Sequence, residues 1–147
     1  MMTTQYTKPL PQPLNPAPSK EFWEAAQRHE LVMPRCTHCG RIFWYPREQC
    51  PNPTCFSDAR LGKDLGWTSV SGKGVLYSYT VVHQPAVGFE SDSPYVVCLV
   101  ELEEGQGIRM MSNLVDCKLE DIKVGMKVEA TYDDVTDAWT LVKFKPA

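Results

Sequence analysis

Four cysteines occur as two short pairs in the first half of the chain, at Cys36, Cys39, Cys50 and Cys55. Ten residues separate the pairs, and Gly40 follows the first pair where the backbone has to turn sharply. Two such knuckles facing each other supply the four thiolates of a tetrahedral zinc site. Because protein atoms fill all four positions, the pattern predicts a structural zinc ion rather than a catalytic one.

Two disulfides or a redox dithiol are the alternative interpretation of these cysteines. Residues 1–5 show neither the basic nor the apolar region of a secretory signal, and cytoplasmic thiols stay reduced. We therefore expect a cytoplasmic protein that binds metal. Four residues, two of them proline, lie inside the second pair, so its knuckle should be wider than the first.

The composition is that of a soluble globular protein, with 43% hydrophobic and 22% charged residues among 147. No apolar run approaches the ~20 residues that a membrane helix needs. The net charge of -3 is uneven: residues 32–63 carry five basic and two acidic side chains, whereas residues 64–147 carry seven basic and thirteen acidic ones. Only the first of these segments could attract a phosphate backbone, so we expect neither a membrane nor a nucleic-acid partner.

The segments around the cysteines read as an arm, a helix and a short strand. Residues 5–18 contain five prolines and predict an extended arm, which is either a disordered tail or a segment packed on a partner subunit. Ser19 can cap a helix over residues 20–31, with Phe22, Ala26 and His29 on one face. Residues 41–47 predict an aromatic strand, and at least one of its three adjacent aromatic side chains should be exposed.

From residue 66 the hydrophobic pattern has a period of two, which predicts strands. The strands are expected over residues 67–70, 75–82, 95–102, 108–115, 126–132 and 139–144. The nearly continuous run at 95–102 predicts a buried central strand, and Leu119, Ile122 and Val124 of the connector that follows should point inward. Short antiparallel strands without a long helix predict a small closed barrel, with the OB-fold as the preferred member.

Several residues could contact a ligand. Arg41 and Arg47 flank Trp44 beside the knuckles, an arrangement that suits a nucleotide-bearing ligand such as coenzyme A or a single nucleic-acid strand, although such arginines also serve solubility. His83 ends a predicted strand and could meet a ligand. Cys98, in an apolar strand, predicts a small buried hydrophobe. We assign no catalytic residue.

A series of short motifs resembles the domain of unknown function thirty-five family. These motifs extend over nearly the whole chain and include residues 21–23 (EFW), 36–40 (CTHCG), 45–47 (YPR), 71–83 (SGKGVLYSYTVVH), 100–105 (VELEEG) and 124–128 (VGMKV). The resemblance implies a rubredoxin-like zinc ribbon followed by an OB-fold. It also implies an accessory role beside thiolase-superfamily enzymes that act on acyl-CoA: thiolases, hydroxymethylglutaryl-CoA synthase complexes and thiolase-like aldolases. Related domains accompany acyl-CoA hydratases, and in such complexes the catalytic residues belong to the large partner.

We therefore expect a mainly β protein with an arm and short helix at residues 1–31, a zinc ribbon at 32–64 and an OB-fold barrel at 65–147. The predicted function is that of a non-catalytic, zinc-binding subunit of a hetero-oligomeric thiolase or aldolase complex, which stabilises its partner and helps to form the acyl-CoA site. The alternative is a single-stranded nucleic-acid-binding OB-fold protein. A free-standing acyl-CoA binder or enzyme that uses His83 is a third hypothesis.

Overall fold

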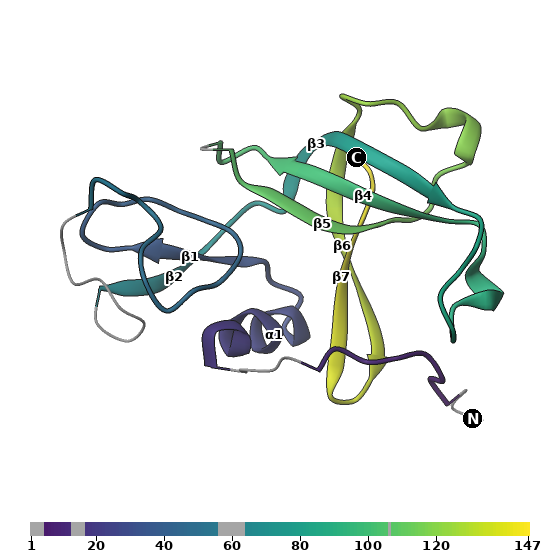
Figure 1. Cartoon of the computed structure of the whole chain (residues 1–147), viewed down its shortest axis with the longest axis horizontal. Helices are drawn as coiled ribbons and strands as arrows, with labels where there is room; N and C mark the ends of the chain where they lie inside the picture. The colour runs from purple at the N-terminus through teal and green to yellow at the C-terminus, as the bar shows by residue number, and fades with distance from the viewer. Residues whose placement is uncertain (1–4, 13–16, 56–63, 106) are drawn as a thin grey trace.

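The computed structural model describes residues 5–12, 17–55, 64–105 and 107–147. A region containing the four cysteines lies at one end, a β-barrel lies at the other, and a helix sits between them (Figure 1). The first regular elements are η1 (Ala17–Ser19) and α1 (Lys20–Gln27). Then β1 (Val32–Cys36) pairs antiparallel with β2 (Leu65–Ser69) to form the ribbon sheet.

The barrel has five strands in the order β3-β4-β5-β7-β6 and is closed by pairing of β3 with β6. They are β3 (Lys73–Val82), β4 (Tyr95–Leu102), β5 (Arg109–Leu114), β6 (Lys127–Thr136) and β7 (Trp139–Pro146). Two 3-10 turns, η2 (Glu90–Asp92) and η3 (Leu119–Asp121), lie in the connections. All neighbours are antiparallel except β5 and β7, which share one parallel pair, Leu114 with Phe144. The predicted closed OB-fold barrel is confirmed.

The helix α1 joins the ribbon to the barrel through aromatic contacts. Phe22 packs against Trp44 of the ribbon with ring centroids 4.9 Å apart, and Trp23 meets Trp139 of β7 edge to face at 5.1 Å. Phe22 and Ala26 belong to the same buried cluster as the barrel interior. An eight-residue helix is too short to be stable alone, so these contacts hold it.

The helix is shorter than predicted. It ends at Gln27, and His29 lies beyond it in the left-handed region at φ 58°. His29 instead places Nε2 3.0 Å from both carboxylate oxygens of Asp134 on β6, and its ring stacks on Tyr132. Ser19 occupies the N-cap position, but its side chain makes no capping hydrogen bond. The contacts of His29 with Asp134 and Tyr132 of the barrel therefore override the helical pattern.

The predicted strand at residues 41–47 is absent. Only an isolated bridge, between Arg35 and Ile42, links this segment to β1, because the backbone there turns around the cysteine knuckles. Phe43 is buried, Trp44 is half-buried and Tyr45 is 50% exposed, which confirms that the three aromatic side chains are not all buried.

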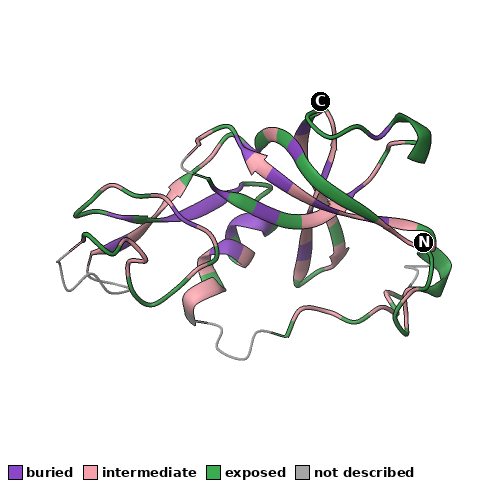
Figure 2. Cartoon of the chain, turned by 45° about the horizontal axis from the view of Figure 1, so that its top comes forward, coloured by how far each residue is buried: buried purple, intermediate pink, exposed green. Residues whose placement is uncertain are grey.

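Two burial predictions for the barrel are only partly confirmed. β4 lies between β3 and β5, as predicted for a central strand, and its buried and half-buried residues alternate strictly (Figure 2). One face of this strand is therefore fully buried and the other is only half-buried. In the connector Ile122 is buried, but Leu119 is 41% and Val124 65% exposed. Only Ile122 of these three side chains therefore packs into the core.

The described part of the arm, residues 5–12, lies against the barrel beside the β6–β7 hairpin (Figure 1). Lys8 forms an ion pair with Asp92 of η2, and Pro9 lies so close to Gly88 that an added Cβ there would touch it. Residues 13–16 of the predicted arm and 56–63 of the predicted ribbon lie outside the described residues.

Candidate metal centre and neighbouring surfaces

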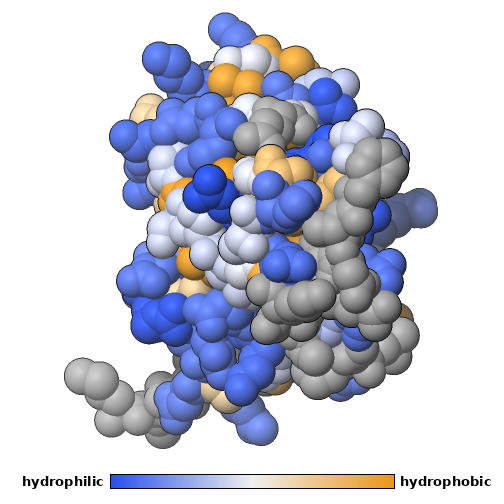
Figure 3. Space-filling model, turned by 90° about the vertical axis from the view of Figure 1, so that its left-hand side faces the viewer, coloured by the Kyte–Doolittle hydropathy of each residue, from blue (hydrophilic) through white to orange (hydrophobic). Residues whose placement is uncertain are grey.

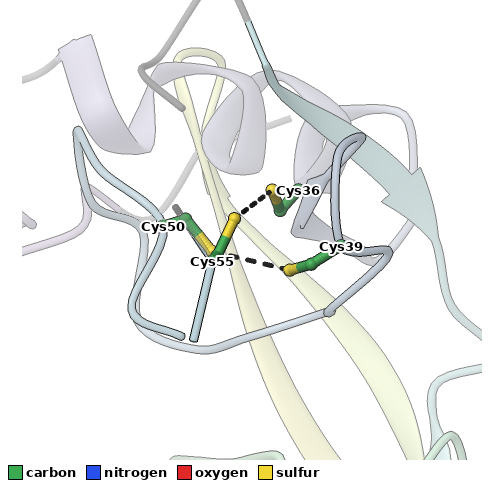
Figure 4. A group of neighbouring side chains, drawn as sticks. All are labelled: Cys36, Cys39, Cys50 and Cys55. Carbon is green, nitrogen blue, oxygen red and sulfur yellow. Dashed lines mark hydrogen bonds between the residues drawn. The ribbon is translucent and has the colours of Figure 1, made fainter. Parts of the chain in front are cut away.

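The four predicted cysteines converge at one point of the ribbon (Figure 4). All four sulfur atoms lie within 4.8 Å of one another. The sulfurs of Cys36 and Cys55 are 3.9 Å apart and those of Cys39 and Cys50 are 3.7 Å apart, with no disulfide. Each of these pairs joins one cysteine of the first knuckle to one of the second, as two facing knuckles require.

Local hydrogen bonds shape both knuckles. Gly40, at φ 73°, donates its N–H to the carbonyl of Cys36 at 2.8 Å, and the N–H of Cys36 in turn bonds to the carbonyl of Arg41 at 2.9 Å. In the wider second knuckle, the Asn52 side chain accepts hydrogen bonds from the backbone N–H and hydroxyl of Thr54. The N–H of Cys55 bonds to the carbonyl of Asn52 at 3.0 Å. The extra residues of this knuckle are therefore absorbed by a turn around Asn52.

The thiols fit a zinc ion. In a tetrahedral site with Zn–S bonds of about 2.3 Å, sulfur atoms are separated by about 3.8 Å, and the two cross-knuckle distances of 3.9 and 3.7 Å match that edge. Cys36 is buried in a small cluster with Phe43 and Leu65, and Cys39 is exposed. Four soft sulfur ligands are what zinc binds in closed structural sites. The cluster therefore supports structural zinc.

The protonation of the cluster is uneven in the absence of an ion. A hydrogen bond from the Asn52 side chain, assisted by the Arg41 backbone, lowers the pKa of Cys39 to about 6. Burial raises the pKa of Cys50 to about 12. Cys39 therefore ionises more readily than Cys50, whose proton a bound cation would have to displace.

The two remaining cysteines show no sign of activation. Cys98 is buried in the barrel, and burial raises its pKa to about 11. The pKa of Cys117 is raised by burial and by the charge of Asp121. Nucleophilic cysteines need a lowered pKa, so both fit the packing role predicted for Cys98.

Three of the four predicted ligand-contacting residues lie together. Arg41, Trp44 and Arg47 line a cavity of about 160 Å³ between the ribbon and the β4–β5 hairpin. Seen from the ribbon end, the surface is mostly hydrophilic (Figure 3). His83 begins the loop between β3 and β4, which lies at the far end of the barrel (Figure 1), and its carbonyl accepts a hydrogen bond from Ser93. The structure therefore does not bring His83 to the arginines.

A larger apolar groove, absent from the predictions, lies where the arm, helix, ribbon and barrel meet. Its volume is about 490 Å³, and Trp23, Trp44, Tyr45 and Met111 line it together with Pro11 of the arm. The aromatic residues at 22–23 and 43–45 were the available sequence signal. Their convergence could not be read from the sequence because it depends on how α1 packs on β7.

The fold and cysteine cluster define a class of small protein in which a metal-binding ribbon is fused to an OB-fold barrel. Residues 23–59 match the family described as the ChsH2 rubredoxin-like zinc ribbon domain, and residues 67–133 match the ChsH2 C-terminal OB-fold domain. A DUF35 domain-containing scaffold protein of Methanocaldococcus jannaschii is 40% identical over 106 residues, or 72% of this chain and 70% of that protein. The chain belongs to the DUF35 family.

Two further similarities come from proteins named for acyl-CoA chemistry or aldolase assembly. A probable enoyl-CoA hydratase alpha subunit of Thermomonospora curvata is 36% identical over 150 residues, which cover 98% of this chain and 44% of that protein. The solved structure of the "Ltp2-ChsH2(DUF35) aldolase" contains a chain with 34% identity and a TM-score of 0.78. That match covers 92% of this chain and 98% of the other.

Among the described residues, no helix is both long enough and apolar enough to cross a membrane.

Proposed function

We propose that this chain is a non-catalytic accessory subunit of an acyl-CoA-processing complex whose catalytic partner is a thiolase or a thiolase-like aldolase. The observation that carries the proposal is the similarity to the DUF35 chain of the Ltp2-ChsH2 aldolase, because it covers 98% of that chain at 34% identity. The hydratase alpha subunit, more than twice as long as the matched region, contains a similar unit beside additional sequence. Both similarities associate this fold with a separate catalytic part.

The described chemistry supports a non-catalytic role. The four clustered cysteines would bind zinc, and the ion would cross-link the two knuckles. Because all four zinc ligands would be cysteines, no coordination position would remain for water or substrate. Cys98 has a raised pKa, which disfavours a nucleophile. The subunit's contribution is then to hold a surface in place against the enzyme that performs the reaction.

We propose that Arg41, Trp44 and Arg47 contact the coenzyme A part of the substrate. The cavity that they line, about 160 Å³, is suited to a phosphate group rather than to a whole nucleotide. Two guanidinium groups can donate several hydrogen bonds to phosphate oxygens, and the indole offers an aromatic face to an adjacent base. His83 would have to contact a different part of the ligand, because its loop lies at the other end of the barrel.

Purification of the tagged chain from its native host tests the accessory role. We expect it to elute in a fixed ratio with an enzyme that acts on CoA thioesters, and we expect the isolated chain to show no thioester turnover. A chain that stays monomeric without such an enzyme, or that turns over a thioester alone, would contradict the proposal. Salt-sensitive binding of the isolated chain to a single-stranded oligonucleotide would favour the nucleic-acid alternative.

Calorimetry with coenzyme A and the purified complex tests the ligand contacts. Joint replacement of Arg41 and Arg47 by alanine should raise the Kd about tenfold or more, because each guanidinium–phosphate contact is a charge-assisted bond. The same pair of changes should leave the zinc content unaltered. A His83→Ala variant provides the comparison at the distant loop. An unchanged Kd in the double variant would show that the ribbon arginines do not contact the ligand.

A further inference from the structure

We propose that the outer face of the β3–β4–β5 sheet is the surface on which the catalytic subunit docks. This outer sheet face includes Val75 and Tyr77 of β3, Val97 and Leu99 of β4, and Arg109 and Met111 of β5. Its polar members are Ser78, Thr80, Glu101 and Asn113. The inference rests on the proposed function and adds to it the face that the partner covers.

The strand register places all of these side chains except Tyr77 on one side of the sheet, and the contact of Tyr77 with Arg109 places Tyr77 there too. Leu99 pairs with Met111, and Glu101, two residues further along β4, pairs with both Val75 and Arg109. Side chains directly opposite each other in antiparallel strands share a face. The alternate residues of β4, including Cys98 and Val100, point into the barrel and are buried. The outer row is therefore the side of the sheet that the chain itself covers only in part.

The sequence of β4 is that of a strand covered on both sides. Residues 95–100 read YVVCLV, without one charged residue. Strands with one solvated face normally alternate apolar and polar residues, whereas continuous apolar runs occur where both faces are covered. In this chain Val97 and Leu99 are only half-buried, Tyr77 is 45% exposed and Met111 is 59% exposed. Another protein is needed to supply the second layer.

The charged group on this face is already neutralised and held in place. Arg109 donates from Nε to Glu101 at 2.8 Å, and its guanidinium lies 3.8 Å from the centroid of the Tyr77 ring. Tyrosine and arginine are enriched among the residues that dominate binding energy, and a side chain fixed before binding loses less entropy. The face therefore suits a partner surface with apolar and uncharged polar groups that brings no compensating charge of its own.

The area of the face fits a large partner. Three strands spaced by about 4.8 Å and about eight residues long present a patch of about 15 by 25 Å. A standard interface covers about 800 Å² per partner, which is about a tenth of the 9288 Å² accessible surface of the chain. The patch supplies roughly half of that area. Met111 also lines the apolar groove beside Trp23 and Tyr45, so the groove extends the same surface.

Hydroxyl-radical footprinting of the purified complex and of the isolated chain tests the proposal. We expect labelling of Tyr77 and Met111 to fall at least fivefold in the complex, whereas Val87, 88% exposed in the β3–β4 loop, keeps its labelling. Met110, which is 4% exposed, provides a buried reference next to Met111. The substitution Met111→Glu should weaken assembly at least tenfold, and Val87→Glu should not.

The possible outcomes separate this inference from the proposed function. If a complex with a CoA-thioester enzyme forms but Tyr77 and Met111 remain fully labelled, the docking face is refuted and the accessory function stands. If protection appears in the isolated chain as its concentration rises, the face joins two copies of this chain and the inference fails. If no complex forms, the inference and the proposed function both fail.

Discussion

Removal of the metal should unfold the ribbon and leave the barrel folded. The buried cluster of the ribbon contains Phe43 and Leu65 beside Cys36. Burial of a phenylalanine or leucine side chain contributes about 1.5–3 kcal/mol, whereas a structural zinc ion contributes about 10–16 kcal/mol to a small metal-dependent domain. The barrel interior belongs to a larger cluster, with fully buried Leu76 and Phe144, to which α1 and β1 add a few residues. The two parts should therefore respond differently to a chelator.

Amide NMR spectra and trypsin digestion of the full chain would measure this difference. After chelation, the amide signals of residues 36–55 should collapse to unfolded positions while those of the barrel strands persist. Cleavage at the exposed Arg41 and Arg47 should accelerate at least a hundredfold, because cleavage of an opened segment follows its equilibrium population and each 1.4 kcal/mol is a factor of ten.

Two cysteine variants provide the matched comparison. Cys39→Ser should reproduce the effect of chelation, because it removes one of the four clustered sulfurs. Cys117→Ser alters a cysteine outside the cluster and should keep both the metal and the protease resistance. A metal-free chain whose ribbon signals and protease resistance are unchanged would refute the reasoning.

Three further predictions concern stability. Gly74→Ala should lower the free energy of unfolding, measured by denaturant titration, by about 1–3 kcal/mol, because the added Cβ would overlap the main chain of β4. The same titration should show little change for Gly66→Ala, where the added Cβ meets nothing within 4 Å. Trp23→Ala should cost about 2–4 kcal/mol by removing the edge-to-face contact with β7, and a thermal midpoint equal to that of the parent would contradict the bridging role of α1. The pKa of Asp134 is lowered first by the hydrogen bond from the Thr140 hydroxyl on β7 and then by the hydrogen bond with His29. The stabilising effect of the Asp134 carboxylate is therefore present above the ordinary aspartate pKa and lost as the pH falls through the lowered value. Asp134→Asn should therefore make the melting temperature depend less on pH in the acid range. If Asp134→Asn and the control Asp137→Asn show the same acid dependence as the parent, the prediction is contradicted.

The sequence alone was sufficient for the metal cluster and the barrel topology class. Cys36 and Cys39 are separated by two residues, and a knuckle of that spacing is closed by local backbone hydrogen bonds, which Gly40 permits with its positive φ. The period-two pattern after residue 66 likewise follows from strand geometry, in which alternate side chains face opposite sides. Such local relations are written directly in residue spacing, and the motif order was sufficient to identify the DUF35 family.

Only the tertiary structure decided which surfaces meet. The residues next to His29 in the sequence do not specify its contact with Asp134, which is 105 residues away. They also do not specify that the helix ends at Gln27. The separation of Arg41 from His83 depends on how the barrel closes. Leu99 is only half-buried because of how the rest of the chain packs around β4. These are long-range packing outcomes, in which burial of the aromatic side chains between helix, ribbon and barrel outweighs local preference.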